Sequence, residues 1–178
     1  IVTGWDNHCY QVKAGSDGAW KVEVKTPEAS YKTYDITFTE YKSDPEKKAK
    51  GNQPIATSVS KDVLIGEVWF CSGQSNMEMP LGGFWNCPVE GANETILESK
   101  KYNSSIRVAT IVKDGKQEPQ KMVAGKWEKA EPKNASRFSA CAYYFATTLT
   151  DALDVPVGVI NCSWGGSCVE GWLPKEIL

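Results

Sequence analysis

Residues 61–80 of this 178-residue chain read KDVLIGEVWFCSGQSNMEMP. The apolar run over 63–70 is rich in β-forming residues and predicts a short buried strand. Small and polar residues follow directly at 72–76, where Gly73 allows a tight bend and Ser75 can project above the edge of a sheet. A serine so placed can attack a carbonyl once a base takes its proton. An ordinary strand-to-loop turn would have the same composition, so the residues alone leave both interpretations open.

A second stretch has the same organisation near the end of the chain. Residues 157–162, VGVINC, predict a buried parallel strand, and SWGGS follows it at 163–167. Ligands of open parallel sheets sit beyond the carboxyl ends of the strands, so both stretches are expected to line one crevice. The backbone N–H groups of Gly165 and Gly166 can approach a developing oxyanion. A tight strand-to-helix turn would explain the two glycines equally well.

Two motifs carry a resemblance to a known family. The block GQSNM at 73–77 resembles the first signature block of SGNH-type hydrolases, in the branch of sialate O-acetylesterases and acetyl xylan esterases. The run NCSWGGSCVEGW at 161–172 is similar to a second block of sialate O-acetylesterases, with Cys162 in place of a serine and Ser167 in place of a threonine. A G-x-S-x-G elbow is disfavoured because Met77 stands where it needs glycine. The resemblance covers roughly residues 60 to 178.

The resemblance implies a role for each matching residue. Ser75 corresponds to the nucleophile of the family, and its backbone N–H forms part of the oxyanion hole. A glycine of the second block supplies a further N–H, for which we favour Gly166 over Gly165. Gln74 and Trp164 are assigned to substrate binding. The implied function is a secreted or periplasmic carbohydrate O-acetylesterase whose substrate is an O-acetylated sugar, sialic acid in the first place and acetyl xylan as the alternative. A serine mechanism requires no cofactor.

Two blocks of the family are missing from these residues: an oxyanion asparagine in a Q-G-E-x-N-like run and a D-x-x-H block that supplies the base. The only histidine is His8, which precedes the predicted hydrolase layer and is expected to be a surface or turn residue. We therefore expect the chain to correspond to the first half of the esterase and to associate with a complementing C-terminal part of the same protein. A non-catalytic glycan-binding module remains the alternative.

Composition excludes several other classes of function. The net charge of −2 gives no basis for binding nucleic acid or an anionic membrane. No apolar run approaches the roughly 18 residues of a membrane span. A single histidine and the absence of a C-x-x-C pair disfavour a zinc site. The six cysteines leave open whether any disulfide forms. The chain opens with Ile1 and no methionine, so a leader peptide could have been removed.

The alternation of predicted elements indicates two domains. Residues 1–60 are expected to form a small antiparallel β portion with a charged loop at 44–52, and residues 61–178 an α/β portion with a parallel sheet flanked by helices. The resemblance implies that this second portion is the first half of an SGNH-type hydrolase domain, so that its sheet is incomplete. The predicted strands are 20–24, 34–39, 55–59, 63–70, 106–112, 125–129 and 157–162, and the predicted helices are 93–101 and 138–153, the second with Ser136 as N-cap. The side chains expected to face the core are Ile96, Leu97, Tyr144, Phe145, Thr148, Leu149 and Leu153.

Overall fold

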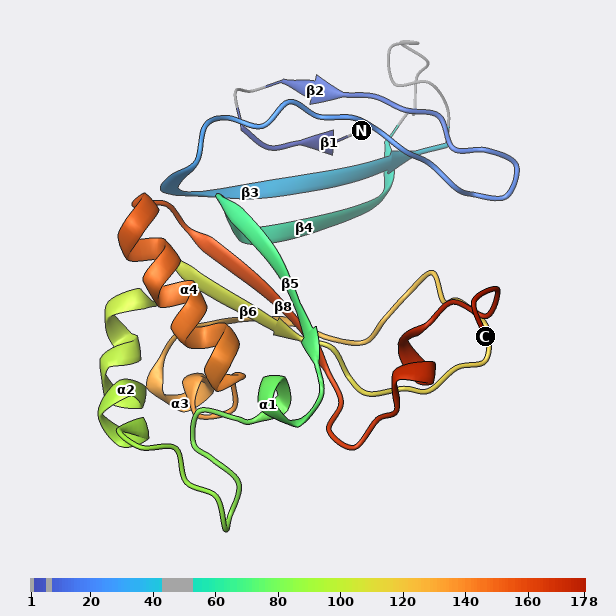
Figure 1. Ribbon diagram of the computed structural model, residues 1–178. Coiled ribbons are helices and arrows are strands. Elements are labelled where there is room, and N and C mark those ends of the chain that lie inside the picture. The colour runs from blue at the N-terminus through green and yellow to red at the C-terminus, as the bar shows by residue number, and fades with distance from the viewer. Residues whose placement is uncertain (1, 6–7, 43–52) are drawn as a thin grey trace. The chain divides into compact units, whose positions relative to one another are not determined.

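The computed structural model describes residues 2–5, 8–42 and 53–178. The chain forms two compact units, Ile1–Ile65 and Gly66–Leu178, which are described separately (Figure 1). Their division lies a few residues beyond the boundary expected at residue 60, because strand β4 continues to Ile65. The charged loop expected at 44–52 lies outside the described residues.

The N-terminal unit is an antiparallel sheet with strand order β2-β1-β3-β4. Its strands are β1 (Val2–Thr3), β2 (Cys9–Tyr10), β3 (Ser30–Tyr41) and β4 (Pro54–Ile65). The predicted strands at 34–39 and 55–59 are confirmed as parts of β3 and β4. The strand predicted at 20–24 is wrong, because this extended segment belongs to no strand ladder. Alternation indicated correctly that one side of the segment is apolar, but it cannot tell whether a neighbouring strand supplies hydrogen bonds.

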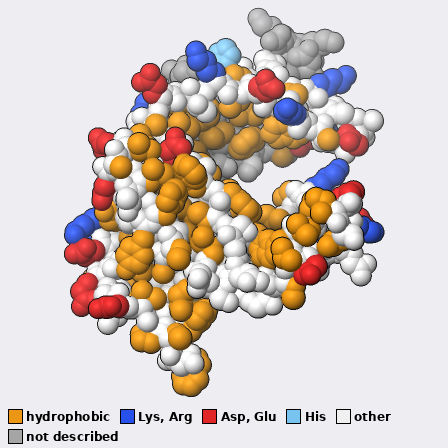
Figure 2. Space-filling model, in the orientation of Figure 1, with side chains coloured by type: hydrophobic (Ala, Val, Ile, Leu, Met, Phe, Trp, Pro, Cys, Tyr) orange, Lys and Arg blue, Asp and Glu red, His pale blue; other side chains and the backbone are white. Residues whose placement is uncertain are grey.

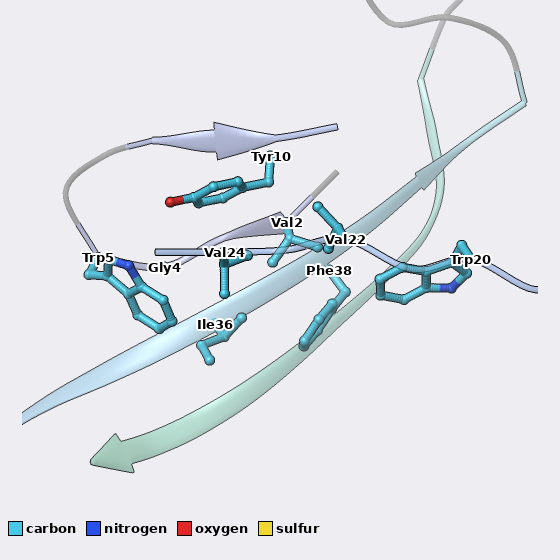
Figure 3. A pocket seen from close by; sticks show the side chains of 9 residues that line it. All are labelled: Val2, Gly4, Trp5, Tyr10, Trp20, Val22, Val24, Ile36 and Phe38. Carbon is cyan, nitrogen blue, oxygen red and sulfur yellow. The ribbon is translucent and has the colours of Figure 1, made fainter. Parts of the chain in front are cut away.

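The apolar side of residues 20–24 lines a cavity of about 220 Å³ on the β1–β3 face (Figure 3). Trp20, Val22 and Val24 face Ile36 and Phe38 across it. The ring of Trp20 lies 6.2 Å from that of Phe38, measured between centroids. The cavity is therefore the apolar interior of this unit, roofed by an irregular segment.

The strand predicted over 63–70 is two strands interrupted at Gly66. A Cβ at Gly66 would lie 2.1 Å from the backbone oxygen of Pro156, so the chain passes too close to that backbone for any side chain. Glu67 then donates its backbone N–H to the same oxygen at 3.0 Å and begins β5. The apolar run spans the end of one unit and the start of the next, which composition alone could not reveal.

The second unit is built on a four-stranded sheet with order β5-β8-β6-β7 (Figure 1). Strands β5, β8 and β6 are parallel, and β7 is antiparallel to β6. The strands are β5 (Glu67–Gly73), β6 (Ile106–Thr110), β7 (Trp127–Lys129) and β8 (Val157–Ser163). The helices are α1 (Ser75–Glu78), α2 (Ala92–Glu98), α3 (Pro132–Ala135) and α4 (Ala140–Leu153), with 3₁₀ turns at Ser99–Tyr102 and Val169–Trp172. The predicted α/β class is confirmed, and the short helices α1 and α3 were not predicted.

Helix α4 packs on β8 and β6, but through a different face from the one expected. Its buried side chains include Ala142, Tyr143 and Ala146, whereas Tyr144 and Phe145 are about two-fifths exposed. Leu149 is partly buried as expected, while Thr148 and Leu153 are exposed, as is Leu97 of α2. The side chains expected to be buried and those that are buried both follow helical spacing. The face with the alanines is the one that packs on the sheet, because small side chains let the helix approach the strands more closely.

Strand β5 is at the edge of the sheet and presents apolar side chains to solvent. Val68 is 61% exposed and Phe70 65% exposed, and Trp69 makes an edge-on ring contact with Phe145 at 5.2 Å. Hydrophobic side chains accordingly reach the surface in several patches (Figure 2). Among the described residues no helix is both long enough and apolar enough to cross a membrane.

The N-cap of α4 is Ser139 rather than Ser136, which ends α3 instead. The Ser139 hydroxyl accepts the backbone N–H of Ala142 at 3.2 Å, and the residue is 1% exposed. Ser139→Ala is therefore expected to lower the free energy of unfolding by about 1 kcal/mol, the usual cost of a lost N-cap. Ser136→Ala should change it by less than about 0.5 kcal/mol. Urea denaturation of both variants would measure this, and equal losses would contradict the assignment of the cap.

Candidate active site

Ser75 stands at the point where β5 becomes helix α1 (Figure 1). The bend is made at Gly73, whose φ of 155° is strained for other residues and whose added Cβ would lie 3.1 Å from that of Met77. Backbone hydrogen bonds from Glu78 to Gln74 and from Met79 to Ser75, both 2.9 Å, close the single helical turn. The serine is exposed at the first position of this turn, so its hydroxyl is accessible to a ligand.

The second glycine-containing loop lies directly beside this turn. Gly73 at the end of β5 is paired with Ser163 at the end of β8, in a parallel register. The backbone N–H of Trp164 then donates to the backbone oxygen of Gly73 at 3.0 Å. The side-chain amide of Gln74 donates to the backbone oxygen of Ser167. The two stretches singled out in the sequence therefore form one structure at one edge of the sheet.

Gly165 lies close against the serine. A Cβ on this glycine would lie 3.2 Å from Ser75 Oγ, 3.5 Å from Ser75 Cα and 2.8 Å from Glu78 Oε2. The next residue, Gly166, has φ +75° and open space around its Cα. A side chain at position 165 would therefore crowd the serine, whereas position 166 requires glycine for its backbone conformation.

Glu78 was not identified from the sequence as a site residue, yet it connects three parts of the site. One carboxylate oxygen accepts the backbone N–H of Gly165, and the other is paired with the Lys113 ammonium. The Lys113 nitrogen also lies 5.9 Å from the centroid of the Trp164 ring, within range of a cation–π interaction. The hydrogen bond from Lys113 lowers the pKa of Glu78, the bond from Gly165 lowers it further, and these effects outweigh partial burial. The carboxylate is consequently ionised at neutral pH.

The structure brings together five of the residues named from the sequence: Gln74, Ser75, Trp164, Gly165 and Gly166. His8 belongs to the other unit, where its ring packs edge-on against Tyr10 with centroids 4.6 Å apart. Within the described ranges, no group of three histidine, cysteine or acidic side chains is arranged to hold a metal ion. All six cysteines are described, and none is disulfide-bonded.

Comparison with known proteins agrees with the two motifs. The human sialate O-acetylesterase is 35% identical over 116 residues, which is 62% of this chain and 22% of the human protein. The mouse sialate O-acetylesterase is 32% identical over 122 residues, with 66% of this chain and 22% of the mouse protein covered. The chain is sialate O-acetylesterase-like. It thus spans about one fifth of the length of these relatives, and no protein-family model matches it.

A solved structure supports the same relationship for the fold. The crystal structure of a carbohydrate acetylesterase from Xanthomonas citri superposes with a TM-score of 0.80 at 28% sequence identity. The match covers 98% of this sialate O-acetylesterase-like chain and 36% of the Xanthomonas chain. The sheet and helices described above are therefore consistent with an SGNH-like hydrolase fold.

Proposed function

We propose that the protein containing this chain is a carbohydrate O-acetylesterase that uses Ser75 as its nucleophile and acts on O-acetylated sialic acid. The observation that supports this most directly is the approach of Gly165 to Ser75, where a Cβ would lie 3.2 Å from the serine oxygen. An exposed serine on a tight turn, next to a glycine-rich loop, is the arrangement that acyl transfer requires. The O-acetylated sugar is inferred from the names of the relatives.

In the proposed reaction Ser75 Oγ bonds to the acetyl carbonyl carbon while a general base takes the hydroxyl proton. The carbonyl oxygen becomes an oxyanion and accepts backbone N–H groups of Ser75 and Gly166. Gly165 is the weaker candidate because its N–H already donates to Glu78. Collapse of the intermediate breaks the ester bond, and the departing sugar oxygen receives the proton. Water then hydrolyses the acetyl-serine, which releases acetate and restores Ser75.

The base is proposed to come from a segment of the same protein outside these 178 residues. Gly66–Leu178 contains no histidine, and Glu78 has a lowered pKa and both oxygens engaged, which makes it a poor proton acceptor. General-base assistance contributes about 10²–10⁴ to such a rate. Exposed Val68 and Phe70 on edge strand β5, which leads directly to Ser75, offer this segment an apolar surface.

Trp164 and Gln74 were assigned to substrate binding, and their contacts in the structure leave different groups available to a substrate. Trp164 is 39% exposed next to Ser75, so part of its ring is available for a sugar. Gln74 donates one amide N–H to the backbone oxygen of Ser167, which leaves its second N–H and its amide oxygen for a substrate hydroxyl. Nothing in these contacts distinguishes sialic acid from xylan, so acetyl xylan remains the alternative substrate.

The proposal is tested with the full-length protein. It should release acetate from O-acetylated sialic acid faster than from acetyl xylan, and a fluorophosphonate probe should add its mass to the peptide that contains Ser75. The reverse order of substrates would favour the xylan alternative. Sugar binding without acetate release or labelling would identify a glycan-binding module and contradict the esterase proposal.

A further inference from the structure

Glu78 occupies a particular place relative to the proposed nucleophile. It lies three residues after Ser75 on the single turn of α1, and its carboxylate reaches across to the loop after β8. Lys113, from the segment after β6, holds the other carboxylate oxygen. The Glu78 side chain is 23% exposed, and that of Lys113 is 40% exposed. One carboxylate thus connects the nucleophile turn, the glycine loop and the segment after β6.

The group that Glu78 holds is the peptide N–H of a glycine-containing loop. Two consecutive glycines restrict the backbone little, so the direction of their N–H groups must be set by contacts. A hydrogen bond to an ionised acceptor is about twice as strong as a neutral one. Since Gly165 N–H donates to Glu78, the orientation of the Trp164–Gly165 peptide is fixed, and the Gly165–Gly166 peptide continues from this anchored point.

We propose that Glu78, held by Lys113, is a positioning residue that orients the Gly165–Gly166 turn so that the Gly166 N–H faces the acetyl oxygen. This inference rests on the proposed esterase function. Oxyanion stabilisation needs donors that are placed before the charge develops. The loss of Glu78 should therefore affect the transition state more than the bound substrate, and so lower kcat more than it raises KM.

Glu78→Ala in the full-length protein is expected to lower kcat roughly 10- to 100-fold, less than the 10²–10³ of a deleted oxyanion donor, with KM within about twofold. Glu78→Gln keeps an acceptor oxygen for Gly165 and should recover part of this loss. Lys113→Met should also lower kcat. The double variant Glu78→Ala/Lys113→Met should be no slower than Glu78→Ala alone, because Lys113 is proposed to act only by holding the Glu78 carboxylate.

The matched control is Glu128→Gln. Glu128 lies on β7, its side chain is 18% exposed, and it pairs with Arg137 at 3.1 Å and Lys126 at 3.0 Å. Its loss should shift the melting temperature about as much as Glu78→Gln and leave kcat unchanged. A Glu78→Ala variant with the parent kcat, or one whose loss of kcat is matched by Glu128→Gln, would overturn the positioning role.

The same experiment separates this inference from the function on which it rests. Acetate release by the parent protein and its loss in Ser75→Ala establish the esterase independently of Glu78. A parent protein without acetate release, or a fully active Ser75→Ala, overturns the esterase function and the positioning role together. An active, Ser75-dependent parent with an unimpaired Glu78→Ala overturns the positioning role alone.

Discussion

Ser75→Ala is expected to lower acetate release by at least about 10³-fold. Deleting a nucleophilic serine can cost about 10⁶ in kcat, and what remains comes from binding and the oxyanion hole. The exposed position of Ser75 on a short turn means that the free energy of unfolding should change by less than about 0.5 kcal/mol. Acetate release by the full-length variant, measured beside its urea denaturation curve, would separate lost chemistry from lost fold.

A second serine provides the control for this substitution. Ser72 is also exposed, lies three residues earlier in β5, and pairs across the sheet with Cys162. Ser72→Ala should retain the parent rate and remain reactive with a fluorophosphonate probe. If Ser75→Ala kept the parent rate while Ser72→Ala lost it, the nucleophile would have to be reassigned to Ser72.

The location of the site could be predicted because it depends on local sequence and on one rule of topology. Strand β8 is marked by the β-forming residues Val157, Val159 and Ile160, and both loops begin where such residues give way to small ones. Parallel strands bring their carboxyl ends to the same edge. The observed pairing of Gly73 with Ser163 agrees with the expected common crevice, but that β5 and β8 are neighbouring strands was not predicted.

Other features depended on tertiary contacts that periodicity does not contain. The stripe of α4 around Tyr144 and the stripe around Tyr143 fit helical spacing equally, and only the approach of the alanines to β8 decides between them. Ser136 and Ser139 are both plausible N-caps, but Pro132 starts a separate helix, α3, and Ser136 is its C-cap. The interruption at Gly66 results from contact with Pro156, ninety positions later in the chain.

Glu78 and Lys113 show the same limit within the site. Glu78 stood in the stretch that defined the nucleophile, and its spacing of three residues from Ser75 places it on the same helical turn. The sequence did not reveal the partners of Glu78: Lys113 lies outside every predicted strand and helix, and Gly165 lies 87 residues away. An acidic residue one turn after a proposed nucleophile is the signal that could have drawn attention to it.

Gly165→Ala is expected to lower kcat by about 10²-fold with little change in stability. The new methyl group would lie 2.8 Å from Glu78 Oε2 and 3.2 Å from Ser75 Oγ, and the first distance is too short to persist. The Glu78 carboxylate is the end of a flexible side chain, so it can withdraw, but it then releases the Gly165 N–H. Misplacement of reacting groups by about 1 Å can cost about 10²-fold in rate.

Substitutions at two further glycines serve as controls, because they test whether the loss of kcat comes from crowding of Ser75 or from replacing any glycine of this region. Gly171 has open space around it, so Gly171→Ala should keep the parent kcat. Gly166 also has open space but a φ of +75°, so Gly166→Ala should cost about 1–2 kcal/mol of stability through backbone strain. Measured kcat and melting temperatures for the three variants would give a different pattern for each. A Gly165→Ala variant with the parent kcat would mean that this loop does not lie against Ser75 when the reaction occurs, which would remove the main structural support for the esterase site.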